Sequence, residues 1–151
     1  MSIQIGDKVP VFTAQKQDGG TFDLNDYLGK PLVIYFYPKD FTPGCTTQAC
    51  SFRDFYQDFQ DLGAEVIGIS GDTAASHEAF QSKYKLPFIL LSDSDRKIRK
   101  SFGVPTNLFG LLPGRVTYVV HPDGTVKMVF NSMSAKNHIT KALEMVKRFS
   151  N

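Results

Sequence analysis

The sequence predicts an α/β fold, with a central mixed β-sheet flanked by helices, in a single domain over residues 1–151. Two apolar runs, over residues 31–37 and 64–69, are rich in β-branched and aromatic residues, which is typical of strands buried on both faces. Each run is followed by a segment whose apolar residues have helical spacing, and this order predicts parallel strands joined by helices. Two later strand patterns joined by a turn predict a hairpin.

The first half of the chain is expected to form an extra N-terminal hairpin and then a strand–helix–strand–helix unit. An Asp-Gly-Gly turn divides the hairpin, Pro38 ends the first buried strand, and Gly63 ends the helix that follows it. The apolar residues of that helix lie close to one face. In order, the expected elements are a hairpin over 12–22, a strand over 31–37, a helix over 46–62, a strand over 64–69 and a helix over 72–84.

The second half is expected to complete the sheet and close the chain with a helix. A Pro- and Gly-rich stretch indicates a loop, and the Pro and Asp-Gly within residues 121–124 indicate a tight turn between two strands. The last helix has apolar residues at three- and four-residue spacing. In order, the expected elements are a strand over 87–91, a helix over 94–102, a loop over 103–114, strands over 115–120 and 125–130, and a helix over 136–149.

Composition excludes several classes of function. The chain has 151 residues and a formal net charge of +2 without runs of like charge, so neither nucleic acid nor a membrane surface is an expected partner. No apolar stretch approaches the length of a membrane span. Residues 1–12 lack the charged and apolar regions of a signal peptide, which predicts a cytoplasmic location.

The two cysteines, Cys45 and Cys50, are the candidate reactive groups. Zinc is disfavoured because the three histidines are scattered, without ligand spacing. Cys45 is expected at the start of a helix, where unpaired N–H groups and the helix dipole favour the nucleophilic thiolate. The stiff prolines around it and Gly44 suit the approach of a small substrate. A cysteine where a buried strand passes into its helix is the arrangement of the thioredoxin fold; a buried, inert Cys45 is the alternative.

The spacing of the cysteines predicts a conformational change. Five residues apart on one helix, their Cα atoms would be separated by roughly 8.6 Å. A disulfide needs about 4.4–6.8 Å. A bond between Cys45 and Cys50 therefore requires the helix to unwind locally, although Cys50 also fits a core position on the apolar face of that helix.

The segment Pro38-x-x-x-Thr42-x-x-Cys45 resembles the active-site pattern of the peroxiredoxins, and a second cysteine five residues on resembles the peroxiredoxin Q, or bacterioferritin-comigratory, subgroup. The resemblance runs from about residue 3 to 149. It implies a thioredoxin fold of the peroxiredoxin type. The segment Asn107-Leu-Phe-Gly110 is most similar to the corresponding segment of cyanobacterial and chloroplast members. A chloroplast location is therefore the alternative to a cytoplasmic one.

The resemblance also implies residue roles. Cys45 would attack a peroxide and become a sulfenic acid, and Cys50 would resolve it as an intramolecular disulfide. Thr42 would hydrogen-bond the thiolate and the peroxide, Arg115 would hold the thiolate and stabilise the leaving oxygen, and Pro38 would shield the sulfur from water. Thioredoxin or a related dithiol protein would reduce the disulfide. The resemblance implies a monomer that needs no cofactor and no metal.

Two rival functions and several single residues remain to be considered. A thiol–disulfide exchanger on the same fold is the first rival, although such proteins usually space their cysteines two residues apart. A binding domain with incidental thiols is the second. Phe41 stands where many relatives carry a polar residue and could favour bulkier hydroperoxides. The histidines, His77, His121 and His138, are expected to have no role in the chemistry, and Arg53 fits a helix surface as well as a site.

Overall fold

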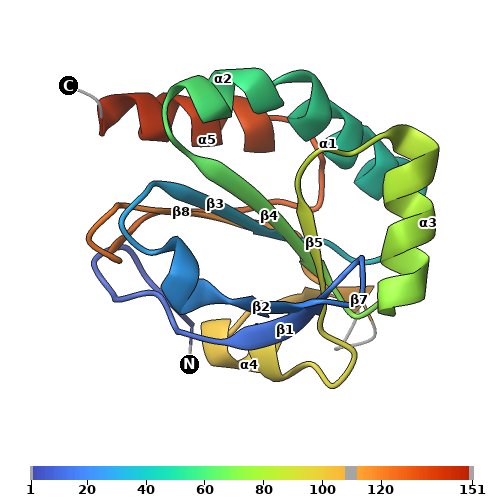
Figure 1. Ribbon diagram of the computed structural model, residues 1–151. Coiled ribbons are helices and arrows are strands. Elements are labelled where there is room, and N and C mark those ends of the chain that lie inside the picture. Colours follow the sequence, from blue (N-terminus) through green and yellow to red (C-terminus); the bar gives the residue numbers. More distant parts are fainter. Residues whose placement is uncertain (1, 108–111, 150–151) are drawn as a thin grey trace.

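The computed structural model describes residues 2–107 and 112–149. It confirms the α/β class and places a seven-stranded mixed sheet between helices (Figure 1). The elements are β1 Thr13–Lys16, β2 Thr21–Asp23, the 3-10 helix η1 Leu24–Tyr27, β3 Leu32–Phe36, α1 Pro43–Asp54, α2 Tyr56–Asp61, β4 Glu65–Ser70, α3 Ala74–Tyr84, β5 Ile89–Ser92, α4 Lys97–Phe102, β6 Thr106–Asn107, β7 Leu112–Pro113, β8 Val116–Val120, β9 Val126–Asn131 and α5 His138–Arg148.

The sheet has the strand order β2-β1-β5-β4-β3-β8-β9. The central strands β3, β4 and β5 are parallel, as the strand–helix alternation predicts, while β8 pairs antiparallel with β3 and with β9. The N-terminal hairpin of β1 and β2 extends the sheet beside β5. The carboxyl ends of β3, β4 and β5 therefore meet at one edge, the edge where ligand sites of parallel sheets form.

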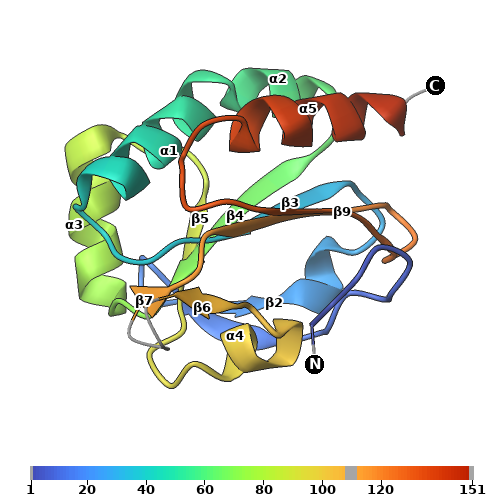
Figure 2. The same ribbon diagram turned by 180° about the vertical axis from the view of Figure 1, so that it is seen from behind.

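Two layers of side chains cover the two faces of the sheet. One core lies under α1, α2, α3 and α5, and the other lies under α4 and the N-terminal segment (Figure 2). Strands β3 and β8 are buried along their whole length because both of their faces are covered. No helix in the described part of the chain has the length and apolar character needed to cross a bilayer.

The structure corrects three expectations. The helix expected over 46–62 begins earlier, at Pro43, and is interrupted at Phe55, where the backbone leaves the helical region and α2 begins. Phe55 is consequently 45% exposed and does not belong to the apolar face. The loop expected over 103–114 contains a two-stranded ribbon, β6 with β7, and residues 108–111 of that loop lie outside the described residues.

Candidate active site

The loop after β3 leads directly into the first turn of α1 and carries the predicted reactive cysteine. Thr42 caps this helix with extended backbone, and its carbonyl accepts a hydrogen bond from the N–H of Thr46 at 2.8 Å. Pro43 occupies the first turn, where a missing N–H costs nothing. Cys45 is therefore held among the unpaired N–H groups of the helix start, as predicted, and is 1% exposed.

Arg115 lies against Cys45, although 70 residues separate the two in sequence. Its Nη2 donates to Cys45 Sγ at 3.3 Å. Arg115 is 4% exposed and immediately precedes β8, the strand that pairs with β3. The pairing of these two strands brings the guanidinium to the start of α1 and sets a fixed positive charge beside the sulfur.

Gln48 is a site residue that was not predicted from the sequence. It lies one turn after Cys45 on α1, is fully buried, and its Oε1 accepts a short hydrogen bond from Arg115 Nη1. The third donor of the guanidinium, Nε, reaches the carbonyl of Met133 at 2.9 Å. Gln48 Nε2 has no hydrogen-bond partner among the described residues. The i, i+3 spacing from Cys45 was the available signal, because it places both side chains on one helix face.

Gly44 allows the guanidinium to approach the helix closely. A Cβ at this position would lie 3.1 Å from Arg115 Nη2, closer than a side-chain carbon normally comes. The sequence suggested that this glycine serves the approach of substrate, whereas the structure shows that its missing side chain makes room for Arg115.

Thr42 and Pro38 lie in the same loop, but neither is hydrogen-bonded to Cys45 in the described part of the chain. The Thr42 hydroxyl donates to the carbonyl of Lys39 at 2.8 Å. Its oxygen keeps lone pairs that can accept from a further donor. Pro38 is half-buried and lies two residues after the end of β3. The role of Thr42 toward thiolate and peroxide, and the shielding role of Pro38, stay predictions.

Cys50 lies on the same unbroken helix as Cys45, and both thiols are free. It is half-buried, whereas Cys45 is buried. The structure thus shows the dithiol form in which helix geometry keeps the two cysteines too far apart to bond.

Phe41 directly precedes Thr42 and has a left-handed backbone with φ of 66°. This conformation is strained for a bulky residue. The side chain is 45% exposed, and its ring packs edge-on against Phe80 of α3 at 5.1 Å between centroids. An apolar ring therefore stands at the surface beside the active-site loop.

Two histidines that were expected to have no role are fully buried and hydrogen-bonded. His77 contacts the Asp40 carboxylate at 2.7 Å and the Leu91 carbonyl at 2.9 Å. His138 contacts the Thr117 hydroxyl at 2.7 Å, and burial lowers the pKa of its imidazole from the usual 6.5. These contacts join segments far apart in sequence, so sequence alone gave no sign of them.

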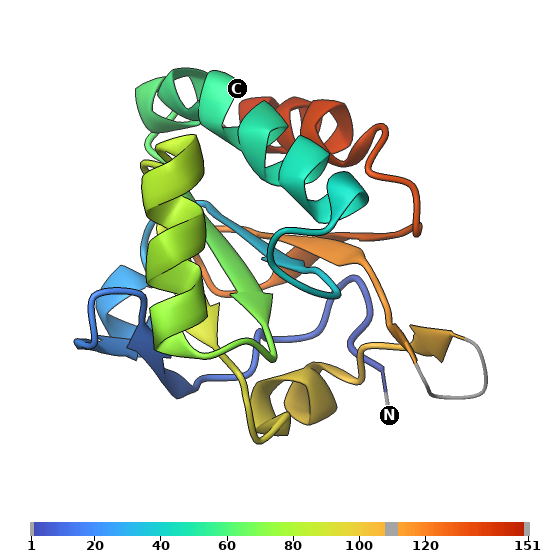
Figure 3. The ribbon, with the colours of Figure 1, turned by 90° about the vertical axis from the view of Figure 1, so that its right-hand side faces the viewer.

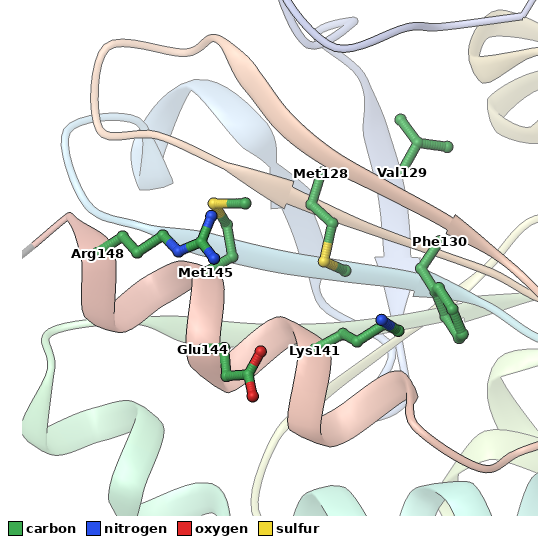
Figure 4. A pocket seen from close by; sticks show the side chains of 7 residues that line it. All are labelled: Met128, Val129, Phe130, Lys141, Glu144, Met145 and Arg148. Atoms are coloured by element: carbon green, nitrogen blue, oxygen red, sulfur yellow. The ribbon is translucent and has the colours of Figure 1, made fainter.

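A shallow groove of about 270 Å³ lies between the edge strand β9 and α5 (Figure 4). Met128 and Phe130 point from β9 toward the helix, while Val129 between them points away. The groove is lined by none of the predicted site residues. It is therefore separate from the cysteine site.

Comparisons with known proteins agree with this geometry. The sequence pattern of the AhpC/TSA family matches residues 5–129. The chain is 54% identical to "Peroxiredoxin Q, chloroplastic" of Suaeda salsa and 53% identical to the protein of that name from Sedum lineare, in each case over 93% of this chain. The alignment covers 66% and 76% of these relatives, so the chain spans about two thirds to three quarters of their length.

Solved structures give the same picture. Peroxidoxin BcpB of Mycobacterium tuberculosis superposes with a TM-score of 0.89 at 35% identity, covering 97% of both chains. The bacterioferritin comigratory protein of Xanthomonas campestris, whose structure is described in terms of alkyl peroxide reduction, has a TM-score of 0.86 at 31% identity, covering 93% of this chain and 92% of that one.

Proposed function

Because the chain belongs to the AhpC/TSA family, in its peroxiredoxin Q branch, we propose that it is a thiol peroxidase whose nucleophile is Cys45. The observation that carries this assignment is the contact of Arg115 Nη2 with Cys45 Sγ at 3.3 Å in a buried site. A fixed positive charge favours thiolate over thiol at the sulfur. The same charge is available to the oxygen that leaves when the O–O bond breaks.

The proposed reaction has two steps on this chain. The Cys45 thiolate attacks one peroxide oxygen, forming an S–O bond and breaking the O–O bond, and the second oxygen leaves and takes a proton to become water or an alcohol. The Cys50 thiol then displaces water from the Cys45 sulfenic acid and forms the disulfide. A dithiol protein such as thioredoxin supplies the two electrons that return both thiols. Neither step needs a metal or other cofactor.

Thr42, Pro38 and Gln48 are proposed to shape the site around the reacting sulfur. The oxygen of the Thr42 hydroxyl can accept from a peroxide O–H, and Pro38 limits access of water from the side of β3. The buried Gln48 Nε2 adds a donor that no described residue uses. Gln48 also holds Arg115 through Nη1, which leaves Nη2 directed at the sulfur.

Intact mass under non-reducing conditions tests this proposal. One equivalent of hydrogen peroxide is added to reduced wild type, Cys45→Ser and Cys50→Ser. We expect wild type to lose about 2 Da as the disulfide forms. Cys50→Ser is expected to gain about 16 or 32 Da as Cys45 oxidises, and Cys45→Ser is expected to stay unchanged. A wild type that keeps its mass would contradict the peroxidase assignment and favour a disulfide exchanger or a binding domain.

Phe41 is proposed to favour bulky hydroperoxides, because its exposed ring extends an apolar surface beside the active-site loop. The test compares the rates for cumene hydroperoxide and hydrogen peroxide in Phe41→Asp. Phe55→Asp is the matched control, since Phe55 is also 45% exposed but lies at the far end of α1. The ratio should fall in Phe41→Asp only; an unchanged ratio would remove this role.

The remaining assignments concern assembly, partners and location. We propose one domain over residues 1–151 that acts as a monomer, because both cysteines of the proposed cycle are on one helix. We propose no nucleic-acid or membrane partner. For location we propose the cytoplasm or the chloroplast, and the names of the relatives favour the chloroplast. Fractionation of the source cells with an antibody would decide between them.

A further inference from the structure

A buried polar cluster lies beside the active-site loop, and the proposed reaction uses none of its groups. Its centre is the contact between Asp40 Oδ2 and His77 Nδ1 at 2.7 Å, and both side chains are almost fully buried. Asp40 belongs to the loop that joins β3 to α1, and His77 belongs to α3, which lies beside that loop (Figure 3). Burying two ionisable groups is costly, so a function for the pair is expected.

The hydrogen bonds define where the protons of the pair lie. His77 Nε2 must donate at 2.9 Å to the carbonyl of Leu91, because a carbonyl can only accept. Tyr37 donates to Asp40 Oδ1 at 2.6 Å, and Ser76 donates to Asp40 Oδ2 at 2.8 Å. One proton must then lie between Asp40 Oδ2 and His77 Nδ1, since two lone pairs would otherwise face each other at 2.7 Å.

A second carboxylate, Asp72, completes the cluster. Its Oδ2 accepts from the backbone N–H of Asp40 at 2.8 Å and from the Ser70 hydroxyl at 2.6 Å. Asp40, Asp72 and His77 are close enough to hold a cation. However, Asp40 already takes part in three hydrogen bonds and Asp72 accepts two, so protein groups satisfy these carboxyls. The cluster is therefore a closed hydrogen-bond network.

The network fixes the loop that carries the predicted peroxide contacts. Residues 37–42 are tied to α3 through the side chain of Asp40 and to the end of β4 through its backbone. His77 adds a tie to β5 through the Leu91 carbonyl. Pro38 and Thr42 lie within this loop, on either side of Asp40. Movement of the loop would displace both relative to Cys45, which is held independently through Arg115.

We propose that Asp40 and His77 are positioning residues for peroxide reduction, holding the Pro38–Thr42 loop in register with Cys45. The inference rests on the proposed peroxidase function. Misplacing a group by about 1 Å can slow a reaction as much as 100-fold. Loss of the contact between the two side chains should therefore slow attack on peroxide more than it changes the intrinsic reactivity of the sulfur.

Two isosteres of His77 separate its two hydrogen bonds. In His77→Asn the amide N–H can replace Nδ1 and donate to Asp40, whereas in His77→Gln it can replace Nε2 and donate to Leu91. Each variant is assayed for the rate of Cys45 oxidation by hydrogen peroxide and for the rate of Cys45 alkylation by iodoacetamide. We expect about a tenfold or greater loss of the peroxide rate in His77→Gln, a smaller loss in His77→Asn, and alkylation within about twofold of wild type in both.

Two further variants keep the test decisive. Ser76→Ala removes one donor to Asp40 from a half-buried position and should lower the peroxide rate severalfold in a folded protein. His121→Gln, in the β8–β9 turn, is the matched control and should change neither rate. Equal peroxide rates in wild type, His77→Gln and Ser76→Ala would overturn the inference, and so would parallel losses in oxidation and alkylation. An inert wild type would instead overturn the proposed function, and this inference with it.

Discussion

The two halves of α1 are held against the sheet by different forces. The first half, around Cys45 and Gln48, is tied by polar contacts to Arg115. The second half is held by the fully buried Phe52, whose ring stacks on Tyr35 at 4.6 Å between centroids. Burial of a phenylalanine and a hydrogen bond to a charged group each contribute about 1.5–3 kcal/mol, but only the hydrogen bonds of Arg115 depend on the charge and position of Cys45 and Gln48.

This difference explains how one helix can serve both a fixed site and a disulfide. Cys45 and Cys50 can bond only if the turns between them unwind. Unwinding breaks the backbone hydrogen bonds of these turns and the contacts of Arg115 with Gln48 and Cys45. Oxidation of a Cys45 thiolate also removes the negative charge that attracts the guanidinium. Phe52 can keep the second half of the helix docked meanwhile, because its ring packs on the core beyond Cys50.

The largest expected effect is a loss of stability that differs between substitutions in the two halves of α1. Phe52→Ala should lower the free energy of unfolding by about 3–5 kcal/mol, because it leaves a cavity in the core. Gln48→Ala should lower it by about 1.5–3 kcal/mol, because it removes a buried hydrogen bond to the charged guanidinium. Urea unfolding of the reduced proteins measures both. Equal losses would contradict the division of α1 into a polar and an apolar half.

Arg115→Lys should lower the rate of Cys45 oxidation by about 100-fold or more. Lysine keeps the charge but cannot contact Cys45, Gln48 and Met133 at once, as the guanidinium does. Stopped-flow oxidation by hydrogen peroxide measures the rate. Arg148→Lys, on the exposed face of α5, is the control. A wild-type rate in Arg115→Lys would show that only the charge matters.

Gln48→Glu tests whether the first half of α1 needs a neutral partner for Arg115. The added carboxylate would offset the guanidinium charge and oppose formation of the thiolate nearby. Alkylation of Cys45 by iodoacetamide at neutral pH should slow by about tenfold. Gln57→Glu, an exposed substitution on α2, is the control. An unchanged rate of alkylation in Gln48→Glu would show that Gln48 does not influence the reactivity of the Cys45 sulfur.

The smallest expected effect is a pH dependence of the protein's stability that arises from His138, a neighbour of Arg115. Burial lowers the pKa of His138 below 6.5, so the folded protein favours the neutral ring and the unfolded chain takes up the proton first. Stability is therefore full above about pH 6.5 and falls as the pH is lowered, by at most about 1.4 kcal/mol per pH unit. His138→Asn should show a shallower slope than His121→Asn in urea unfolding between pH 7 and 5. Identical slopes in the two variants would show that the pH dependence of stability does not arise from His138.

The sequence predicted the fold class and brought the right strands together. Apolar runs marked β3 and β4 because both are buried on both faces, and the turn at residues 121–124 marked the β8–β9 hairpin. The interruption at Phe55 was missed, since apolar spacing continues across it. The β6–β7 ribbon was missed because it is short and rich in turn-forming residues.

For the active site, the sequence motif predicted which residues take part, but it did not predict the hydrogen bonds between them. Cys45 and Arg115 were predicted to meet, and the structure brings them together. Gln48 was missed because its i, i+3 spacing from Cys45 places it on the same helix face but does not show that it is buried against Arg115. Asp40 and His77 were missed for the same reason, as their contact joins residues 37 apart in sequence.

Hydrogen exchange after oxidation tests most directly the claim that peroxide drives local unwinding of α1. Amide exchange is measured by mass spectrometry in the reduced protein and after one equivalent of hydrogen peroxide, with Cys50→Ser as the control that cannot close the disulfide. We expect protection of residues 45–50 to be lost in the oxidised wild type alone, while Phe52 and Phe59 keep theirs. An intramolecular disulfide with full protection of residues 45–50 would contradict this claim.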